Sequence, residues 1–146
     1  MKKIHIILVI VFLPFSCSLF KPALNIKEII AVKDRIDASN NPAQKFILSE
    51  NLKEENVTLE NLTVKDVTES SNIDYDFCVI TDIPTDKGNV ECYIYSRNTY
   101  VVSKLEKGKS KINVKGKYSR FFTMLDQYYT KLEITGADIQ VITEKK

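Results

Sequence analysis

The densest group of side chains that could bind a ligand lies in the last third of the chain. Seven basic residues occur between positions 104 and 120, with Tyr118, Phe121 and Phe122 among or beside them. They are Lys104, Lys107, Lys109, Lys111, Lys115, Lys117 and Arg120. Basic side chains hold phosphate, sulfate or carboxylate groups, and aromatic rings between them can stack on the bases of a single-stranded nucleic acid. One interpretation of the pattern is therefore a site for an anionic ligand.

The same lysines can equally form the solvent-facing side of a strand. Lys115 and Lys117 alternate with Val114 and Gly116, as on a strand with one buried face. The chain has 21 Lys and Arg residues against 19 Asp and Glu, and the loss of two N-terminal lysines, described below, leaves it formally neutral. A neutral chain lacks the positive field that drives non-specific binding of nucleic acids. We therefore favour a solvated face, keep an anionic lipid headgroup or a polysaccharide as the alternative, and do not expect a nucleic-acid partner.

Residues for catalysis or for metal binding are scarce. The single histidine, His5, lies in a segment that we expect to be removed, which excludes Ser-His-Asp and Cys-His catalysis and every site with a histidine ligand. Cys78 and Cys92 are too few for an all-cysteine zinc site. Carboxylate pairs and Ser-Lys arrangements remain, without a recognisable short motif. We expect no enzyme, no catalytic residues, no metal and no cofactor.

The two cysteines could instead form a disulfide, since an exported protein can keep one. Cys92 alternates with Val90 and Ile94 and should point into the core. On the preceding predicted strand Val79 should point inward, which turns Cys78 outward. Strand alternation thus favours two free thiols, buried or partly buried, with a Cys78–Cys92 disulfide as the alternative.

Aromatic residues also share strand faces. Tyr93 and Tyr95 lie on one face, as do Tyr75 and Phe77 on the neighbouring segment. Such rings can form a binding platform, although cross-strand aromatic pairs commonly just stabilise a sheet, by ~0.2–1 kcal/mol each.

The first 17 residues indicate where the protein is located. Lys2 and Lys3 precede a nearly unbroken apolar run, Ile4 to Phe15, which is shorter than the about 20 residues that cross a bilayer. Ser16 then precedes Cys17. The arrangement resembles the signal peptide of bacterial lipoproteins, in a relaxed form such as spirochaetal lipoproteins have. The resemblance implies that Cys17 is acylated and anchors the protein in a membrane of the bacterial envelope, at its periplasmic face or at the cell surface. The alternative is ordinary secretion with Cys17 unmodified.

The mature chain is long enough for one small domain. Residues 18–25 are predicted to be a tether. Asn25 and Glu28 have the spacing of a capping box, which predicts a helix over 26–37. Asn41 followed by Pro42 predicts a second, brief helix over 42–48. Residues 26–49 therefore form an N-terminal helical segment.

Beyond this segment the apolar residues follow the period of a strand. We expect strands at 57–67, 75–83, 90–95, 112–122 and 129–134, with 137–142 extending or following the last one. A short helix is expected at 99–105. The first strand needs a slip or bulge between two alternating halves. Three strands, a short helix and two more strands are the order of the OB-fold, so residues 50–146 should form a five-stranded OB barrel preceded by one or two helices.

Three short motifs resemble those of the tRNA-anticodon-like OB domains in small bacterial lipoproteins and envelope proteins. They are Val90-Glu91-Cys92-Tyr93-Ile94, Leu105-Glu106-Lys107-Gly108-Lys109 and Ile112-Asn113-Val114-Lys115-Gly116-Lys117. That family commonly has a glycine in its first strand, which residues 57–67 lack.

The resemblance implies a membrane-anchored lipoprotein, held in the bilayer through its acylated N-terminus. Its role would be non-catalytic binding or interaction within the envelope, with a protein or a glycan as partner. The alternative is a periplasmic OB protein that binds an anionic polymer or oligosaccharide through the basic segment 104–122.

Overall fold

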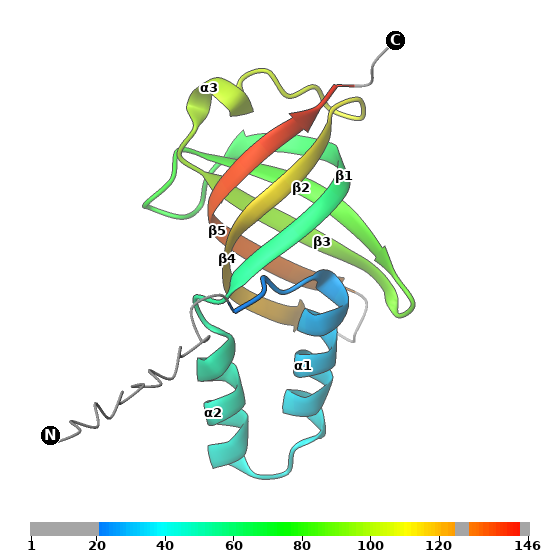
Figure 1. The fold of residues 1–146 in the computed structure, drawn as a ribbon, viewed down its shortest axis with the longest axis vertical. Coiled ribbons are helices and arrows are strands. Elements are labelled where there is room, and N and C mark those ends of the chain that lie inside the picture. Colours follow the sequence, from blue (N-terminus) through cyan, green and yellow to red (C-terminus); the bar gives the residue numbers. More distant parts are fainter. Residues whose placement is uncertain (1–20, 125–128, 144–146) are drawn as a thin grey trace, which may run out of the picture.

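The computed structural model describes residues 21–124 and 129–143, which form two helices followed by five strands and one further short helix (Figure 1). The elements are α1 (Ile26–Ala38), α2 (Pro42–Leu52), β1 (Asn56–Glu69), β2 (Phe77–Thr85), β3 (Gly88–Ser96), α3 (Thr99–Val102), β4 (Lys111–Met124) and β5 (Tyr129–Ile142). Cys17 and the predicted signal segment lie outside the described residues. In the described part of the chain, no helix is long and apolar enough to span a bilayer.

The five strands close into a barrel in the order β1-β2-β3-β5-β4. Neighbouring strands are antiparallel, except that β3 and β5 run parallel over Val90–Ile94 and Thr130–Ile134. This pairing, with a helix between β3 and β4, is the topology of the OB-fold. The predicted fold class is therefore confirmed: a mainly β chain with a five-stranded OB barrel behind N-terminal helices.

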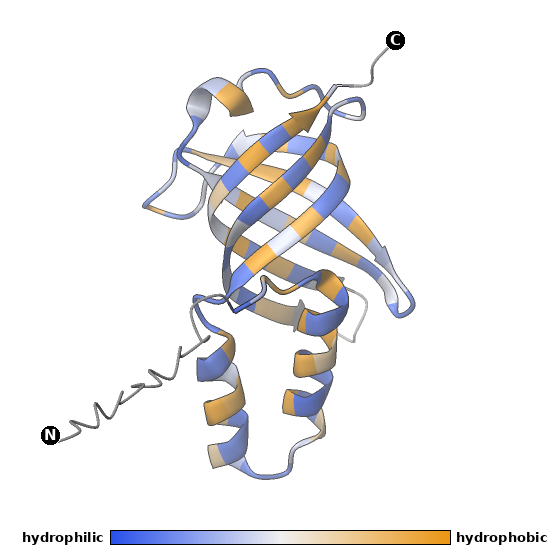
Figure 2. Cartoon of the chain, viewed as in Figure 1, coloured by the Kyte–Doolittle hydropathy of each residue, from blue (hydrophilic) through white to orange (hydrophobic). Residues whose placement is uncertain are grey.

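Strand alternation fills the barrel. Every strand contributes at least one fully buried aliphatic side chain, namely Val64, Val79, Ile94, Ile112 and Leu132. Hydrophobic and hydrophilic residues alternate along the strands in Figure 2, as a sheet with one face on a core requires. The helices cover the two ends, because Ile29 of α1 and Val102 of α3 belong to the same apolar cluster.

The interruption predicted in the first strand is a bulge at Asn61. The register of β1 against β4 shifts between Leu59 and Leu62, and Asn61 has a φ of 54°. Asparagine tolerates this left-handed conformation better than most residues with a side chain. The backbone N–H of Asn61 also donates to Oδ1 of Asn113, at 2.9 Å. Asparagine thus occupies the strained position in this strand, which has no glycine.

Both predicted N-terminal helices have the caps that the sequence indicates. Asn25 and Glu28 form the complete capping box of α1, and Asn41 accepts from the first turn of α2. α2 extends to Leu52 rather than ending at 48, because Leu52 is buried at the barrel.

The segment predicted to be a tether is partly docked on the barrel. The N–H of Leu24 donates to the carbonyl of Asn56 at 2.7 Å, and the N–H of Thr58 donates to the carbonyl of Leu24 at 2.9 Å. Leu24 thereby makes a short parallel bridge to β1. Lys21 is paired with Glu55. Of the predicted tether 18–25, the described residues from 21 onward therefore follow the edge of β1.

The structure also sets the bounds of three other predicted elements. The second strand begins at Phe77 and not at 75, because the Ser70 hydroxyl and the Asn72 side chain hold residues 70–76 in a turn-rich loop. The last two apolar segments form one strand, β5, which bends at Gly136 with a φ of 57°. The helix α3 ends at Val102, shorter than predicted.

Candidate functional site

The outer face of the barrel over β3, β5 and β4 carries the densest set of polar and aromatic contacts. We define this outer face by Glu91 and Tyr93 of β3, Lys131 and Glu133 of β5, and Arg120 of β4. Strand pairing sets Glu91 beside Lys131 and Tyr93 beside Glu133, while Arg120 lies opposite Glu133. The residues of β3 and β5 sit at the outward positions of the alternation, and a register shift in β4 between Tyr118 and Arg120 turns Arg120 to the same face.

Glu91 is the centre of a hydrogen-bonded network on this face. Lys65 Nζ donates to its Oε1 at 2.8 Å, and the Tyr93 hydroxyl donates to its Oε2 at 2.8 Å. Lys131 Nζ donates to the Tyr93 hydroxyl at 2.9 Å and lies 4.2 Å from the centre of the same ring. Burial opposes the charge on Glu91, but the hydrogen bonds from Lys65 and Tyr93 outweigh it, so its pKa lies below the usual value. The carboxylate stays ionised and serves as an acceptor.

Glu133 is held by a two-pronged ion pair. Arg120 donates from Nε to Oε2 at 2.6 Å and from Nη2 to Oε1 at 3.0 Å. The Glu133 side chain is 9% exposed, whereas that of Arg120 is 66% exposed. The guanidinium also lies 5.2 Å from the centre of the Phe122 ring. Arg120 therefore satisfies a buried carboxylate and presents its own outer edge to solvent.

The β1–β2 loop covers one end of the outer face. The Tyr75 hydroxyl accepts from the N–H of Gly136 at 2.8 Å. The Tyr75 ring packs against that of Tyr95, with ring centres 5.7 Å apart, and Arg97 lies 5.4 Å from the Tyr75 centre. The sequence predicted shared strand faces for Tyr93 with Tyr95 and for Tyr75 with Phe77, whereas in the structure Tyr75 lies in the loop before β2 and packs on Tyr95, which is buried.

Cys78 points to the outer face, as strand alternation predicts, and is nevertheless buried. Cys78 pairs with Tyr95 on the outer face, yet only 2% of it is exposed, because Tyr95 and the loop carrying Tyr75 cover this part of the sheet. Burial raises the pKa of the Cys78 thiol to about 12. Cys92 points into the core, on the opposite face. Both thiols are free, so the alternative of a disulfide is not realised here.

The predicted basic segment does not form one groove. Lys104, Lys107 and Lys109 lie in the loop between α3 and β4, whereas Lys117 lies in the middle of β4 and is paired with Glu54, just after α2. Most of these cations have a carboxylate partner, as follows: Lys107 with Asp66 at 3.2 Å, Lys109 with Glu106 at 2.8 Å, Lys117 with Glu54 at 3.3 Å, and Arg120 with Glu133.

The three other basic residues of that segment differ in their surroundings. Lys104 is exposed and lies 3.7 Å from the centre of the Tyr100 ring. Lys115 is exposed, with Thr58 and Asp138 as its strand neighbours. Lys111 is half-buried at the start of β4. The structure thus spreads the predicted anionic-ligand residues from the α3–β4 loop to the middle and the second half of β4.

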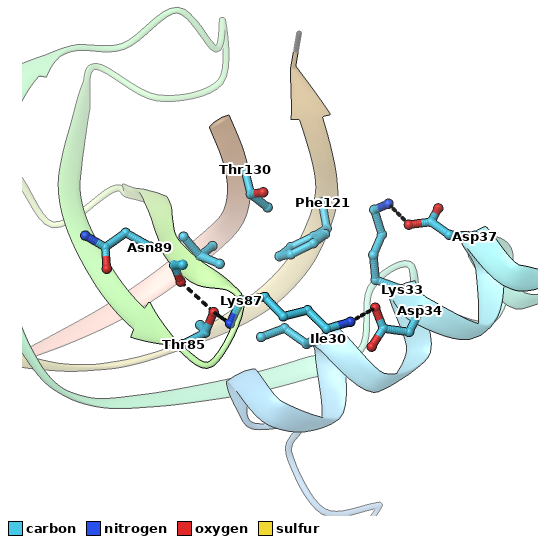
Figure 3. Close-up of a pocket in the computed structure, with 11 residues that line it drawn as sticks. Ile30, Lys33, Asp34, Asp37, Thr85, Lys87, Asn89, Phe121 and Thr130 are labelled. Atoms are coloured by element: carbon cyan, nitrogen blue, oxygen red, sulfur yellow. Dashed lines mark hydrogen bonds and ion pairs between the residues drawn. The ribbon is translucent and has the colours of Figure 1, made fainter. Parts of the chain in front are cut away.

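A cleft that the sequence analysis missed separates α1 from the turn between β2 and β3 (Figure 3). It has a volume of about 530 Å³, with Ile30, Val90 and Phe121 among its apolar lining. Lys87 pairs with Asp34 across its mouth at 2.7 Å. The two residues of this ion pair are 53 positions apart in the chain, so no local sequence pattern predicts their contact.

The charges in this cleft are also mutually satisfied. Lys33 pairs with Asp37 at 2.5 Å and lies 5.9 Å from the centre of the Phe121 ring. Within residues 21–124 and 129–143 there is no group of three or more His, Cys, Asp or Glu side chains that could hold a metal ion. The cleft and the outer face both offer hydrogen bonds and ring faces, and neither presents a concentrated charge of one sign.

Comparison with known proteins identifies no family for this chain and gives a distant structural neighbour. No family model matches the chain, and no curated protein matches it. Among solved structures, the chain is similar to Rim1, a mitochondrial single-stranded DNA binding protein from S. cerevisiae, with 14% identity and a TM-score of 0.38. The match covers 64% of this chain and 98% of that chain. We assign the OB-fold from the strand order and pairing alone.

Proposed function

We propose that this chain is a membrane-anchored bacterial lipoprotein whose OB barrel is a non-catalytic binding module of the cell envelope. Lys2, Lys3, the apolar run that follows them and Cys17 support the anchor. The outer face supports binding without catalysis: Glu91 is ionised and fully engaged as a hydrogen-bond acceptor, whereas a general acid needs a raised pKa.

One observation carries the binding role: on the outer face, hydrogen bonds connect a tyrosine ring with side chains of both charges. The Tyr93 hydroxyl donates to the carboxylate of Glu91, and Arg120 donates to that of Glu133. Lys131 donates to the Tyr93 hydroxyl. Alternating donors and acceptors beside a ring suit the hydroxyl groups of a glycan. A polyanion would meet the same carboxylates at close range. We therefore propose a neutral envelope oligosaccharide as the ligand.

The anchor is tested by the substitution Cys17→Ala. Two or three acyl chains at ~0.8 kcal/mol per buried methylene make attachment effectively permanent, whereas one chain is marginal. The wild-type protein should sediment with membranes after a high-salt wash, and the variant should be released. A Cys17→Ala protein that stays with the membranes contradicts the lipoprotein assignment.

The proposed ligand is tested with a variant of Tyr93 and with a variant of Tyr100 as its matched control. Tyr93 and Tyr100 each carry a lysine ammonium near the ring, at 4.2 and 3.7 Å from the ring centre, but only Tyr93 lies on the outer face. Full-length protein in detergent micelles is titrated with a linear N-acetylglucosamine oligomer by calorimetry. Binding should be lost in Tyr93→Ala and kept in Tyr100→Ala. No binding by the wild type, or equal loss in both variants, contradicts the proposal.

The alternative ligand, an anionic polymer on the basic segment, is tested in the same assay with heparin. Lys115 is the observation in its favour, because it is exposed and has no ion pair among the described residues. Reversing Lys109, Lys115 and Lys117 to Glu should change stability by no more than about 0.5 kcal/mol each. We expect wild-type and triple-variant proteins to bind heparin equally weakly. Salt-sensitive heparin binding that the triple variant loses would favour the alternative.

A further inference from the structure

The helix α2 leaves apolar side chains in solvent. Phe46 is 65% exposed and Ile47 is 57% exposed, and α2 buries only Leu52. Hydrophobic bands run along α2 in Figure 2, on a helical hairpin that projects from one end of the barrel. A helix of this length gains most of its stability from burying an apolar side, so the hairpin as it stands lacks a partner for that side.

The linker between Cys17 and the docked residues is very short. Both the backbone N–H and the backbone carbonyl of Leu24 are hydrogen-bonded to β1, and the side chain of Lys21 is paired with that of Glu55. Only three residues separate Cys17 from Lys21, and an extended chain advances at most ~3.3–3.6 Å per residue. The four residue steps from Cys17 to Lys21 therefore span at most about 14 Å between Cα atoms.

The docked end of this linker adjoins α2. Glu55, the partner of Lys21, follows α2 by three positions. Phe46 precedes Leu52, the last residue of α2, by six positions, or about 9 Å along the helix axis at 1.5 Å per residue. A linker of about 14 Å thus allows Phe46 to reach the surface in which Cys17 is anchored.

We infer that α2 lies against the bilayer surface and places Phe46 and Ile47 at the boundary between headgroups and acyl chains. This inference rests on the proposed acylation of Cys17. An interfacial helix buries its apolar side ~5–10 Å into that boundary and keeps its polar side in water. Lys45, exposed beside Phe46, can pair with lipid phosphate, while Glu50 is neutralised by Lys53 at 2.5 Å. The acyl anchor and the helical hairpin together set the orientation of the protein, with the barrel on the side of α2 that faces away from the membrane.

The chain has no tryptophan, so a single Phe46→Trp substitution gives an unambiguous optical probe. The matched control is Tyr100→Trp, because Tyr100 is 70% exposed on α3, at the other end of the barrel (Figure 1). Full-length acylated protein is reconstituted into vesicles of phosphatidylcholine and phosphatidylglycerol, with and without brominated acyl chains. We expect the indole emission of the Phe46→Trp variant to shift to shorter wavelength and to be quenched by the brominated lipid. The emission of the Tyr100→Trp variant should be unchanged.

Flotation of the vesicles separates the two claims. Protein that fails to float with the vesicles contradicts the anchor at Cys17. If both variants float, but the Phe46→Trp variant is quenched no more than the Tyr100→Trp variant, the inference about α2 is overturned and the anchor stands. A shift of the Phe46→Trp emission without quenching by brominated lipid also overturns it, because the apolar side is then covered by protein, such as a second copy of the chain.

Discussion

Replacement of Arg120 by alanine should destabilise the barrel far more than replacement of any freely solvated lysine. The change removes both hydrogen bonds to Glu133, at 2.6 and 3.0 Å, and leaves a carboxylate that is 9% exposed without its cation. Removal of one partner of a buried ion pair costs ~3–5 kcal/mol. Arg120 itself is 66% exposed, so solvent screens part of the loss. We therefore expect about 2 kcal/mol, in the range of ~1.5–3 kcal/mol for a hydrogen bond to a charged group.

Urea unfolding followed by circular dichroism measures this cost. With a slope of ~1–3 kcal/mol per molar urea, the midpoint should fall by about 1 M. Lys115→Ala, on the same strand and without an ion pair among the described residues, is the matched control and should stay within about 0.5 kcal/mol of wild type.

The double variant Arg120→Ala with Glu133→Gln tests the cause. Glutamine has nearly the shape of glutamate but no charge, so the double variant should be more stable than Arg120→Ala alone, by about 1 kcal/mol. If Arg120→Ala behaves like the lysine control, or if the double variant is the less stable of the two, then Glu133 is not a buried charge in need of a partner, and the account of the outer face fails.

Three further outcomes are expected. Gly116→Ala should cost about 1–3 kcal/mol in the same assay, because a Cβ there would lie 2.6 Å from Cγ2 of the fully buried Ile134; an unchanged midpoint would contradict the close approach of β4 and β5. In a Cys17→Ala background, Ellman's reagent should react with Cys78 and Cys92 only after unfolding, and fast reaction of one thiol in native protein would contradict their burial. Burial raises the pKa of Cys78 and of Tyr118 to about 12 from 9.0 and 10.0, so the unfolded state loses these protons first. The contribution of these two groups to stability should therefore be constant below about pH 9, and the free energy of unfolding should decline between pH 9 and 12; a free energy of unfolding that rises over that range would refute this.

Several features of this protein follow from the sequence alone, because they depend on contacts within a few residues. The caps at Asn25 and Asn41 belong to this class, since each side chain binds backbone groups two or three positions away. The inward alternation of Val90, Cys92 and Ile94 does as well, because a strand turns successive side chains to opposite faces. Such local rules were sufficient to predict the order of strands and helices along the chain, and that order is the one found in the OB-fold.

Local rules fail where burial depends on what another segment covers. Alternation correctly turned Cys78 outward, but only the fold brings Tyr75 and its loop across the sheet to bury it. The same holds for the docking of Leu24 on β1, which shortens the predicted tether.

The candidate site was the least predictable part. Lysines that form a dense run in the sequence are spread from the α3–β4 loop to the middle of β4, and two of them are paired with carboxylates from distant segments: Lys107 with Asp66 and Lys117 with Glu54. The sequence determined which side chains point outward, because that follows from the two-residue period of a strand. Only the tertiary structure decided which of them meet, because strands far apart in the chain become neighbours when the barrel closes, and an ion pair depends on distance in space.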